Sequence, residues 1–458
     1  MKGPLAPELY DVARPCESWW RETAAPGPAL APLEGDATVD VAVIGGGYAG
    51  LSTALRLAEL GVSCAVLEAG EIGWGASGRN GGIVGLASDK LSHAARARRV
   101  GEAEAARAVA AQVEGAQRLR AFCAAQGVET QGEAEALVAH CPAAFAALAD
   151  APAVGGASLE ILSREAYAER GYEGPEQHGA ALMRPGFGVH PLQLVRAWAR
   201  AAQAAGVAIH PFSEALRWRR EGAAHRVETA RGTLRAGRIV LATNGFTPDG
   251  LHPAFAARAM PVISMIGVTR PLTAEELSRH RWREDNPLAN TRRMLFYWRM
   301  LPQRRLLFGM RGDLTGAEAA APVWRARLAA SLARAFPGWA DIPLTHFWRG
   351  PICATRAYAP AVGRLPDDAS VFHAFGWHGS GVNGAQTAGR LLAEAIVSGE
   401  EAAIPALWRG LPPRILLPGL RTLWLAGAIA GFRLADAMEA RTPLRDRRAR
   451  ASVAAATR

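Results

Sequence analysis

The sequence lacks the patterns of a disulfide scaffold, a metal centre and a membrane span. Its cysteines are odd in number, scattered and without a Cys-x-x-Cys pair, at Cys16, Cys64, Cys123, Cys141 and Cys353. We therefore expect no disulfide framework and no metal site, and a reducing cytoplasm fits this usage. The first residues hold no apolar run of the signal-peptide type. The longest apolar stretch, 422–432, is too short to span a bilayer and predicts a buried or partly buried helix.

Much of the excess positive charge lies at the C-terminal end. The chain has 52 Lys and Arg against 42 Asp and Glu, a formal charge of +10, and its last eighteen residues hold six arginines and one acid, Asp446. We interpret residues 439–458 as a basic, disordered and solvated tail, and we expect no nucleic-acid partner. Weak contact with an anion or a membrane surface is the alternative interpretation.

No catalytic triad and no pair of catalytic carboxylates stands out in the sequence. At 458 residues the chain is too long for one simple core, so we expect two domains or one large α/β domain with a second lobe inserted. Half of the residues are apolar and 21% are charged, which is ordinary for a globular protein. The chemistry therefore has to come from motifs of another kind.

A complete dinucleotide-binding unit begins at residue 39. The β-branched run 39–44 predicts a strand, the glycine-rich segment 45–50 a tight turn, the residues after it a helix, and 62–67 a second strand that ends on Glu68. Gly45 permits the turn, Gly47 lets backbone approach a pyrophosphate, and Gly50 lets the helix pack close to the sheet. Glu68 is placed to accept hydrogen bonds from ribose hydroxyls. A glycine turn without any ligand is the weaker alternative.

Two further glycine clusters follow. Segment 73–82 suits an extended FAD, because small residues and backbone donors can follow its ribityl chain, and Arg79 and Asn80 add side-chain donors. A mobile surface loop is the alternative for this segment. Near the end, a strand at 371–375 runs into the glycine turn 376–384 and a helix, whose N-terminus can supply N–H groups to a second part of a cofactor.

The stretch from 251 to 347 is irregular and rich in aromatics and arginines, and it is the candidate substrate lobe. Arg299 is the best candidate to clamp a substrate carboxylate, although most arginines here are expected to be surface charges. Tyr297 and Trp348 are candidates for an apolar substrate wall, with a role in the core as the alternative.

With these elements in order, the sequence resembles the D-amino-acid oxidase-like FAD-dependent oxidoreductases, and within them it looks most like the gamma-glutamylputrescine oxidase-like amine oxidoreductases. The resemblance rests on the glycine turn 45–50 with its strand, on 66–69, on Gly-Ala-Ser-Gly-Arg-Asn-Gly-Gly at 75–82, on 297–299, 348–350, 376–384 and 421–423. It covers about residues 19–438, and the 75–82 element is its most specific part.

The resemblance implies an α/β fold: an FAD-binding Rossmann-type, glutathione-reductase-like domain (1–90, 150–250 and 345–438) with an interleaved α+β substrate domain on an antiparallel sheet (91–149 and 251–344). Ala215, in a strand after His210, lies where the family uses a valine backbone to hold adenine. The implied cofactor contacts are Gly45, Gly47, Tyr48, Ala49, Gly50, Glu68, Ala69, Gly75, Ala76, Ser77, Arg79, Asn80, Gly81, Gly82, Ala215, Thr243, Gly376, Gly379, Ser380, Gly381 and Val382.

The reaction implied is hydride transfer from the carbon next to an amine nitrogen to flavin N5, with the resulting imine hydrolysed to an aldehyde or keto acid. Oxygen or a quinone would accept the electrons; a D-amino-acid dehydrogenase-type enzyme, a nicotinamide enzyme and a non-catalytic flavin protein are the alternatives. His378 and Ser380 stand in places exchanged relative to the family turn, which weakens a catalytic role for His378. Cys353 is out of register with the cysteine that binds flavin covalently in some relatives, so we expect non-covalent FAD. Met310 stands where a second glycine is usual.

Overall fold

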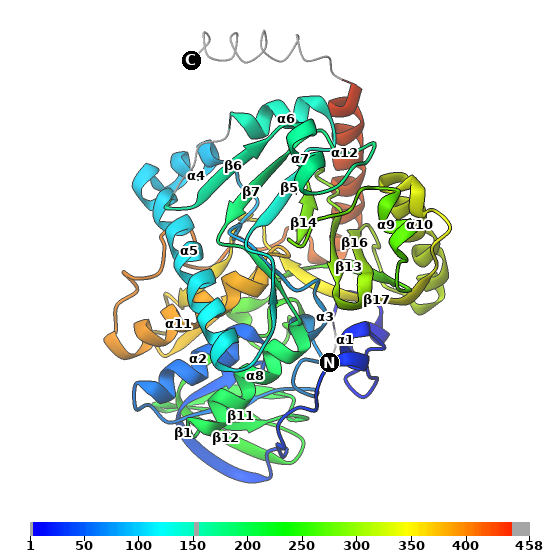
Figure 1. Ribbon diagram of the computed structural model, residues 1–458. Coiled ribbons are helices and arrows are strands. Elements are labelled where there is room, and N and C mark those ends of the chain that lie inside the picture. Colours follow the sequence, from blue (N-terminus) through cyan, green and yellow to red (C-terminus); the bar gives the residue numbers. More distant parts are fainter. Residues whose placement is uncertain (1–2, 151–154, 442–458) are drawn as a thin grey trace.

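The protein is described by a computed structural model that covers residues 3–150 and 155–441. Two eight-stranded sheets and a small three-stranded sheet form its framework (Figure 1). The first sheet has the order β10-β11-β12-β1-β2-β9, and β19 pairs with β12 while β18 pairs with β19. Its strands are β1 (Gly35–Ile44), β2 (Cys64–Leu67), β9 (Ala208–His210), β10 (Arg217–Glu221), β11 (Ala224–Glu228), β12 (Gly232–Leu241), β18 (Ala361–Arg364) and β19 (Val371–Phe375).

Strand β1 shows how the sequence builds this first sheet. It is parallel to both β12 and β2, and its side chains alternate between two cores. Val41 and Val43 pack in the core formed with helices α2 (Tyr48–Glu59), α8 (Pro191–Ala204) and α11 (Gly381–Ser398), whereas Ala42 and Ile44 pack in the core on the opposite face. The predicted strand–turn–helix–strand unit is therefore confirmed, as is the Rossmann-type arrangement.

The second sheet has the order β17-β13-β16-β15-β14-β5-β7-β6, and all neighbouring strands run antiparallel except β14 and β5. One of its faces is covered by helix α10 (Ala321–Ala335), where Trp298 and Phe308 are buried. Tyr297 and Arg299 project from the other face. The strands are β5 (Glu135–Val138), β6 (Ser158–Leu162), β7 (Ala180–Arg184), β13 (Met260–Thr269), β14 (Leu288–Asn290), β15 (Tyr297–Leu301), β16 (Arg305–Arg311) and β17 (Leu344–Ala354).

The remaining elements connect or flank these sheets. The small sheet joins β3 (Ile83–Val84), β8 (Phe187–Val189) and β4 (Thr130–Gln131). The other α-helices are α1 (Trp19–Thr23), α3 (Ala76–Arg79), α4 (His93–Val100), α5 (Glu102–Ala125), α6 (Pro142–Ala149), α7 (Arg164–Arg170), α9 (Ala274–Ser278) and α12 (Arg421–Arg441). Figure 1 shows the first sheet with α2 and α8 in its lower half and β5, β6, β7 and α6 in its upper half.

The structure corrects the expected domain boundaries in four places. Strands β6 and β7, expected in the FAD-binding segment 150–250, and β17, expected in 345–438, belong to the second sheet. Helix α5, expected in the substrate segment 91–149, packs on α11 instead. Helix α12 contacts α6 rather than the first sheet. Alternating apolar residues predict that a strand exists, but they do not reveal which sheet it joins.

The apolar stretch 422–432 forms part of α12, and the expectation that it is buried or partly buried was wrong for most of it. Leu423 is 66% and Trp424 52% exposed, whereas Ile429 is buried. Polar contacts hold this helix: Arg421 pairs with Asp249, and Asp436 accepts hydrogen bonds from the backbone of Arg293 and Met294. No helix within residues 3–150 and 155–441 is long and apolar enough to cross a membrane. The expected tail 439–458 lies almost wholly outside the described residues.

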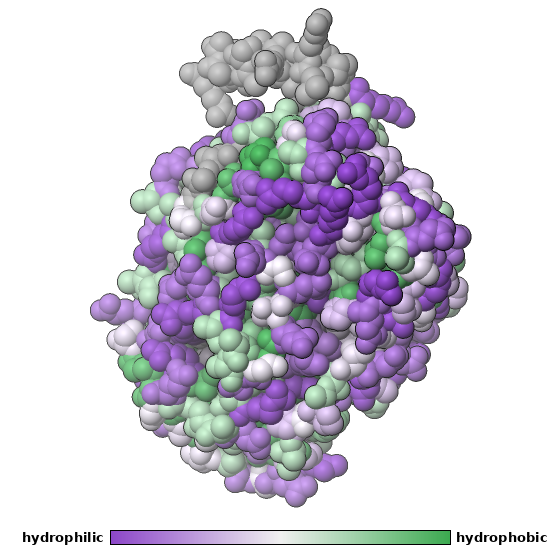
Figure 2. All heavy atoms as spheres, in the orientation of Figure 1, coloured by the Kyte–Doolittle hydropathy of each residue, from purple (hydrophilic) through white to green (hydrophobic). Residues whose placement is uncertain are grey.

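Hydrophilic side chains dominate the face seen in Figure 2, and hydrophobic ones form small separate groups on it. A cavity lies where the carboxyl ends of the first sheet's strands meet strand β17 of the second sheet. Three glycine-rich turns line that cavity.

Candidate functional site

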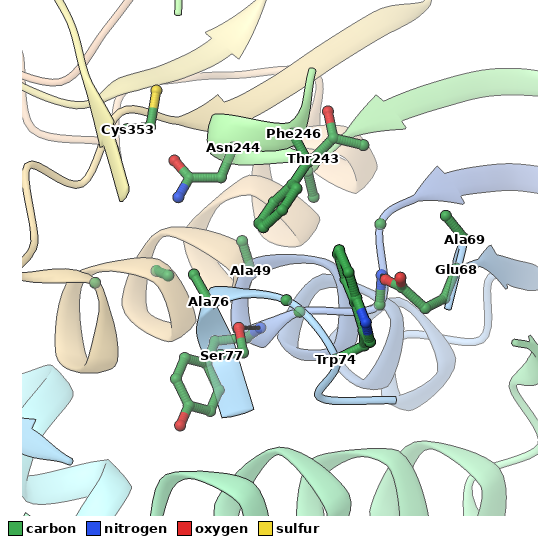
Figure 3. A pocket seen from close by; sticks show the side chains of 18 of the residues that line it. Ala49, Glu68, Ala69, Trp74, Ala76, Ser77, Thr243, Asn244, Phe246 and Cys353 are labelled. Atoms are coloured by element: carbon green, nitrogen blue, oxygen red, sulfur yellow. Dashed lines mark hydrogen bonds between the residues drawn. The ribbon is translucent and has the colours of Figure 1, made fainter. Parts of the chain in front are cut away.

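The cavity has an empty volume of about 1190 Å³ and is enclosed by parts of both lobes (Figure 3). It follows the end of β1 and start of α2, the end of β2, the segment 73–80, the end of β12 and the turn before α11. The predicted cofactor residues that line it are Gly45, Gly47, Tyr48, Ala49, Glu68, Ala69, Gly75, Ala76, Ser77, Asn80, Ala215, Thr243, Gly379, Gly381 and Val382. Ala215 lies in an extended connection before β10 and not in a strand, because β9 ends at His210.

The first glycine turn leaves no room for side chains. Gly45 has a φ of 111°, and a Cβ there would lie 2.7 Å from the carbonyl oxygen of Ala242. A Cβ on Gly50 would overlap the carbonyl oxygen of Gly45, although Gly50 itself does not line the cavity. Helix α2 begins after Gly47, which has no side chain to cap it, so the N–H groups of its first turn beyond Tyr48 are left for a ligand. The Oγ of Ser77 accepts a hydrogen bond from Tyr48 N at 3.1 Å.

Glu68 ties the second strand to this turn. Its Oε2 accepts a hydrogen bond from Gly46 N at 2.7 Å, and its Oε1 accepts one from Gly70 N at 3.0 Å. Burial raises the pKa of the Glu68 carboxyl. Each carboxylate oxygen has a further lone pair, so Glu68 can fix the turn and still accept from a ribose hydroxyl.

The polar side chains of the second glycine cluster, Arg79 and Asn80, form hydrogen bonds with backbone groups of the protein. Asn80 accepts a hydrogen bond from Gly82 N at 2.7 Å and donates to the carbonyl oxygens of Ala76 and Ser77, so it caps helix α3. The Nε of Arg79 donates to the carbonyl oxygen of Trp74, and Arg79 does not line the cavity. The expectation that both side chains donate to a flavin is therefore wrong for Arg79, and for Asn80 the amide donors are already used.

Arg299, the expected carboxylate clamp, holds the backbone of the second glycine cluster at Gly82. It is 3% exposed, and its Nη1 donates to the carbonyl oxygen of Gly82 at 2.9 Å. Burial lowers the pKa of its guanidinium to about 10. Trp348 also holds this backbone, because its Nε1 donates a hydrogen bond to the carbonyl oxygen of Arg79 at 2.7 Å. Neither side chain lines the cavity, so the structure corrects both expectations.

Tyr297 lies at the edge of the site. A Cβ on Gly81 would lie 3.0 Å from its ring, and its hydroxyl shares a hydrogen bond of 2.8 Å with Ser264. Burial raises the pKa of this phenol to about 12, so the hydroxyl stays protonated. Because β-strand side chains alternate, Tyr297 and Arg299 share the face of β15 that packs on residues 79–82.

The third glycine turn lies between β19 and α11. Gly376 and Gly379 have φ values of 87° and 88°, and a Cβ on Gly376 would lie 2.5 Å from the Cγ2 of Thr355. Ser380 is the N-cap residue of α11, but its hydroxyl makes no capping hydrogen bond to the helix, and like Gly376, Gly81 and Gly82 it does not line the cavity. Gly381 starts the helix and lines the cavity.

His378 is held in this turn with its ring directed to the protein. Its Nε2 accepts a hydrogen bond from Thr355 N at 3.3 Å and lies 3.2 Å from the Thr355 Oγ1. Burial, together with the cations Lys90 and Arg311, lowers the pKa of His378 to about 3. The imidazole is therefore neutral near pH 7, and its lone pair is already engaged. The expectation of a catalytic His378 gains no support from this geometry.

Several lining residues were not predicted. Trp74 and Phe246, whose rings lie 5.5 Å apart, form an apolar wall that is labelled in Figure 3. Asn244 has a φ of 48° and accepts a hydrogen bond from Gly376 N, which joins the end of β12 to the third turn. The Asn-Gly pair at 244–245 was the signal for it, because Asn tolerates a positive φ. Cys353 also lines the cavity.

Known proteins share this architecture. A model of the family "FAD dependent oxidoreductase" matches residues 40–395. Gamma-glutamylputrescine oxidoreductase of Escherichia coli K12 is 31% identical over 393 residues, which cover 84% of this chain and 89% of that protein. A probable oxidoreductase, OrdL, of Rhizobium meliloti is 29% identical over 431 residues, 90% of this chain and 97% of that protein.

Solved structures agree on the fold. Glycine oxidase from Geobacillus kaustophilus superposes with a TM-score of 0.64 at 20% identity, covering 80% of this chain and 96% of that one. L-proline dehydrogenase from P. horikoshii gives a TM-score of 0.63 at 17% identity, with coverage of 86% and 99%. Taken with the glycine-lined cavity and the family match over most of the chain, these relatives confirm the expected resemblance. This chain is a member of the FAD-dependent oxidoreductase family.

Proposed function

We propose that this chain oxidises an amine or amino acid at the carbon next to the nitrogen, with non-covalent FAD in the cavity. The observation that carries the proposal is that three glycine turns line one cavity, which strand β17 of the second sheet closes with Ile352 and Cys353. When bound, FAD supplies the hydride acceptor. The relatives named above for glutamylputrescine and glycine act on compounds of this class.

The residues present fit an extended dinucleotide. Glycines stand where side chains would block the cavity or its turns, as Gly45, Gly50 and Gly376 illustrate. The uncapped start of α2 suits a pyrophosphate, and Glu68 suits a ribose. Trp74 and Phe246 offer apolar surface to the cofactor's rings. Gly81, with the Tyr297 ring beside it, marks the side on which substrate would lie.

In this proposal the protein positions the reactants and needs no strong base. Arg299 and Trp348 fix the backbone of residues 79–82 through Gly82 and Arg79. The Tyr297 ring packs against Gly81 of the same loop. The reactive substrate is a neutral amine, whose lone pair stabilises the positive charge that develops as hydride leaves. His378 is not needed as a base, since its Nε2 already accepts a hydrogen bond from the backbone N–H of Thr355.

The purified protein tests this proposal. It should be yellow, and mixing it with amines in the absence of oxygen should bleach the flavin absorbance. Subsequent mixing with air-saturated buffer or with a soluble quinone identifies the electron acceptor, which the proposal leaves as oxygen or quinone. A protein that keeps its flavin but is bleached by no amine would point to a non-catalytic flavin protein. The free cysteines suit a reducing compartment such as the cytoplasm.

A further inference from the structure

Helix α12 and the residues before it expose large apolar side chains on the outside of the molecule, where Figure 1 shows the helix in red at the edge of the fold. Within residues 3–150 and 155–441, eight of the thirteen most exposed large apolar side chains lie between 416 and 438, so the exposure is concentrated in one segment. Isolated apolar residues are normal on a protein surface, but a group of this size marks an interaction surface. We call six of these residues the apolar ridge: Leu416, Leu417, Leu420, Leu423, Trp424 and Leu434.

The helical part of the ridge follows one face of α12. Leu423, Gly427, Gly431 and Leu434 succeed one another at spacings of four, four and three residues, which places them on the same side of the helix. A Cβ on either glycine would meet no atom within 4 Å, so this side of the helix is open. Ile429 is buried on the side that packs on the protein. The exposed face is therefore apolar along three turns.

A hydrogen bond joins the residues before the helix to this face. The indole Nε1 of Trp424 donates to the carbonyl oxygen of Leu416 at 3.1 Å, and the backbone N–H of Leu420 donates to the carbonyl oxygen of Leu417 at 2.8 Å. The polar atom of Trp424 is thus satisfied while 52% of the residue remains exposed. An aromatic side chain of this kind suits a boundary between an apolar phase and water.

The same part of the chain holds most of the excess positive charge. Residues 411–458 contain nine arginines and three acids, so they carry six of the ten net positive charges. Two of these acids, Asp436 and Glu439, are occupied, because both pair with the side chain of Arg293. The acids of α12 therefore leave its exposed face without a free negative charge.

This charge decides between two occupants of the ridge. Arg433 and Arg441 are exposed on α12 and form no ion pair among the described residues. Arg441 follows Leu434 by seven residues, so it continues the apolar face at the end of the helix. A second copy of the chain would set the same cations against one another. A bilayer with anionic lipids attracts these cations and also offers an apolar phase to the leucines.

We propose that α12 docks the protein on the surface of a bilayer that contains anionic phospholipids. The helix lies along the surface, with the apolar ridge at the boundary between headgroups and acyl chains, and the arginines of this segment are attracted to the lipid phosphates. The proposal goes beyond the proposed function and does not depend on it, because no residue of the ridge lines the flavin cavity.

Sedimentation of the purified holoprotein with vesicles tests the proposal. Vesicles of phosphatidylcholine alone are compared with vesicles in which phosphatidylglycerol replaces part of that lipid, each at low and at high salt. The protein should bind the anionic vesicles at least about tenfold more tightly than the neutral ones at low salt. High salt should reduce this difference, because it screens the attraction between arginines and phosphates.

Variants separate the apolar contribution from the charge. The double variant Leu423→Gln, Trp424→Gln should bind anionic vesicles at least about tenfold more weakly, because two large apolar side chains leave the bilayer boundary. Its control is Val397→Gln, which removes an exposed apolar side chain at the end of α11. Arg441→Met should weaken binding about fivefold. Its control is Arg219→Met, which removes an exposed charge on β10. Both controls should bind like the parent.

Each outcome supports or overturns the proposal. Flavin content and melting temperature should match the parent in every variant, since the substituted side chains are exposed, and Leu423→Ala provides a milder second variant. Equal binding to neutral and anionic vesicles, or unchanged binding of the double variant, would overturn the proposal. A dimer in light scattering that the double variant dissociates, without vesicle binding by the parent, would assign the ridge to a second copy. Failure of amines to bleach the flavin would contradict the proposed function and leave the vesicle result unaffected.

Discussion

Gly50 lies where helix α2 crosses the first sheet, against the carbonyl oxygen of Gly45. Gly50→Val should therefore force the helix away from the turn and abolish FAD retention.

Glu68→Ala removes two hydrogen bonds to backbone and one acceptor for ribose, so it should weaken FAD affinity by roughly ten- to a hundredfold. The molar ratio of flavin to protein after dialysis measures FAD retention in both the Gly50→Val and the Glu68→Ala variants. Full flavin content in both variants would show that the cofactor site is misplaced.

His378 should not control the pH dependence of flavin reduction. The pKa of its imidazole is lowered to about 3, far below the range in which an amine substrate loses its proton. A free alkyl ammonium titrates near 10.4, and burial beside the flavin lowers that value by disfavouring the charged form. The rate should thus rise with pH through one ionisation, that of the substrate. Stopped-flow reduction of His378→Asn should give nearly the same apparent pKa, and loss of that ionisation would identify His378 as the base.

Cys353 lines the cavity, but burial raises the pKa of its thiol to about 12. The thiolate is the nucleophile in cysteine chemistry, so this thiol is poorly suited to attack a flavin. We expect acid denaturation to leave the yellow colour in solution. Cys353→Ala should keep FAD with the same affinity within about threefold, and a coloured protein pellet from the parent, colourless in this variant, would contradict the prediction.

At the scale of elements, the glycine turns were predictable and the arginines were not. Gly45, Gly47 and Glu68 could be placed from sequence because a tight strand–helix turn beside a dinucleotide excludes Cβ atoms over a short, local stretch. Arg299 and Arg311 lie on neighbouring strands, and sequence gives no register between those strands. Arg299 proved to support Gly82, and Arg311 donates to the carbonyl oxygen of His378 in the third glycine turn. For the same reason the sheet membership of β17 was missed.

Helix α12 depends on polar anchors more than on apolar burial. The buried carboxylate of Asp436 accepts from the backbone N–H groups of Arg293 and Met294 and pairs with the Arg293 side chain. Asp436→Asn should remove the ion pair and lower the free energy of unfolding of this helix by about 1–3 kcal/mol. Limited proteolysis should then cleave faster within 421–441, with Arg219→Met as a control. Unchanged cleavage would mean that apolar contacts hold α12.

At the scale of the whole molecule, the two lobes share the chain and the reaction site. The family resemblance implied the interleaving, and the first and third glycine turns, which are more than 300 residues apart, line one cavity. Sequence motifs could not predict that Trp74 and Phe246 meet on the wall of the cavity, because no motif links an aromatic residue in the second glycine cluster to one after β12. Such a contact becomes visible only in the tertiary structure.

The late position of β19 and α11 has a consequence for how the protein is made. Strand β19 completes the first sheet beside β12, and α11 lies over α2 with the third glycine turn at its start. A nascent chain on the ribosome therefore holds two of the three turns for most of its synthesis without a complete pocket, and slow long-range pairing follows release. A chain ending at residue 370 should fail to retain FAD although both early motifs are intact. FAD supplied during translation should accordingly raise the yield only of chains that extend past α11.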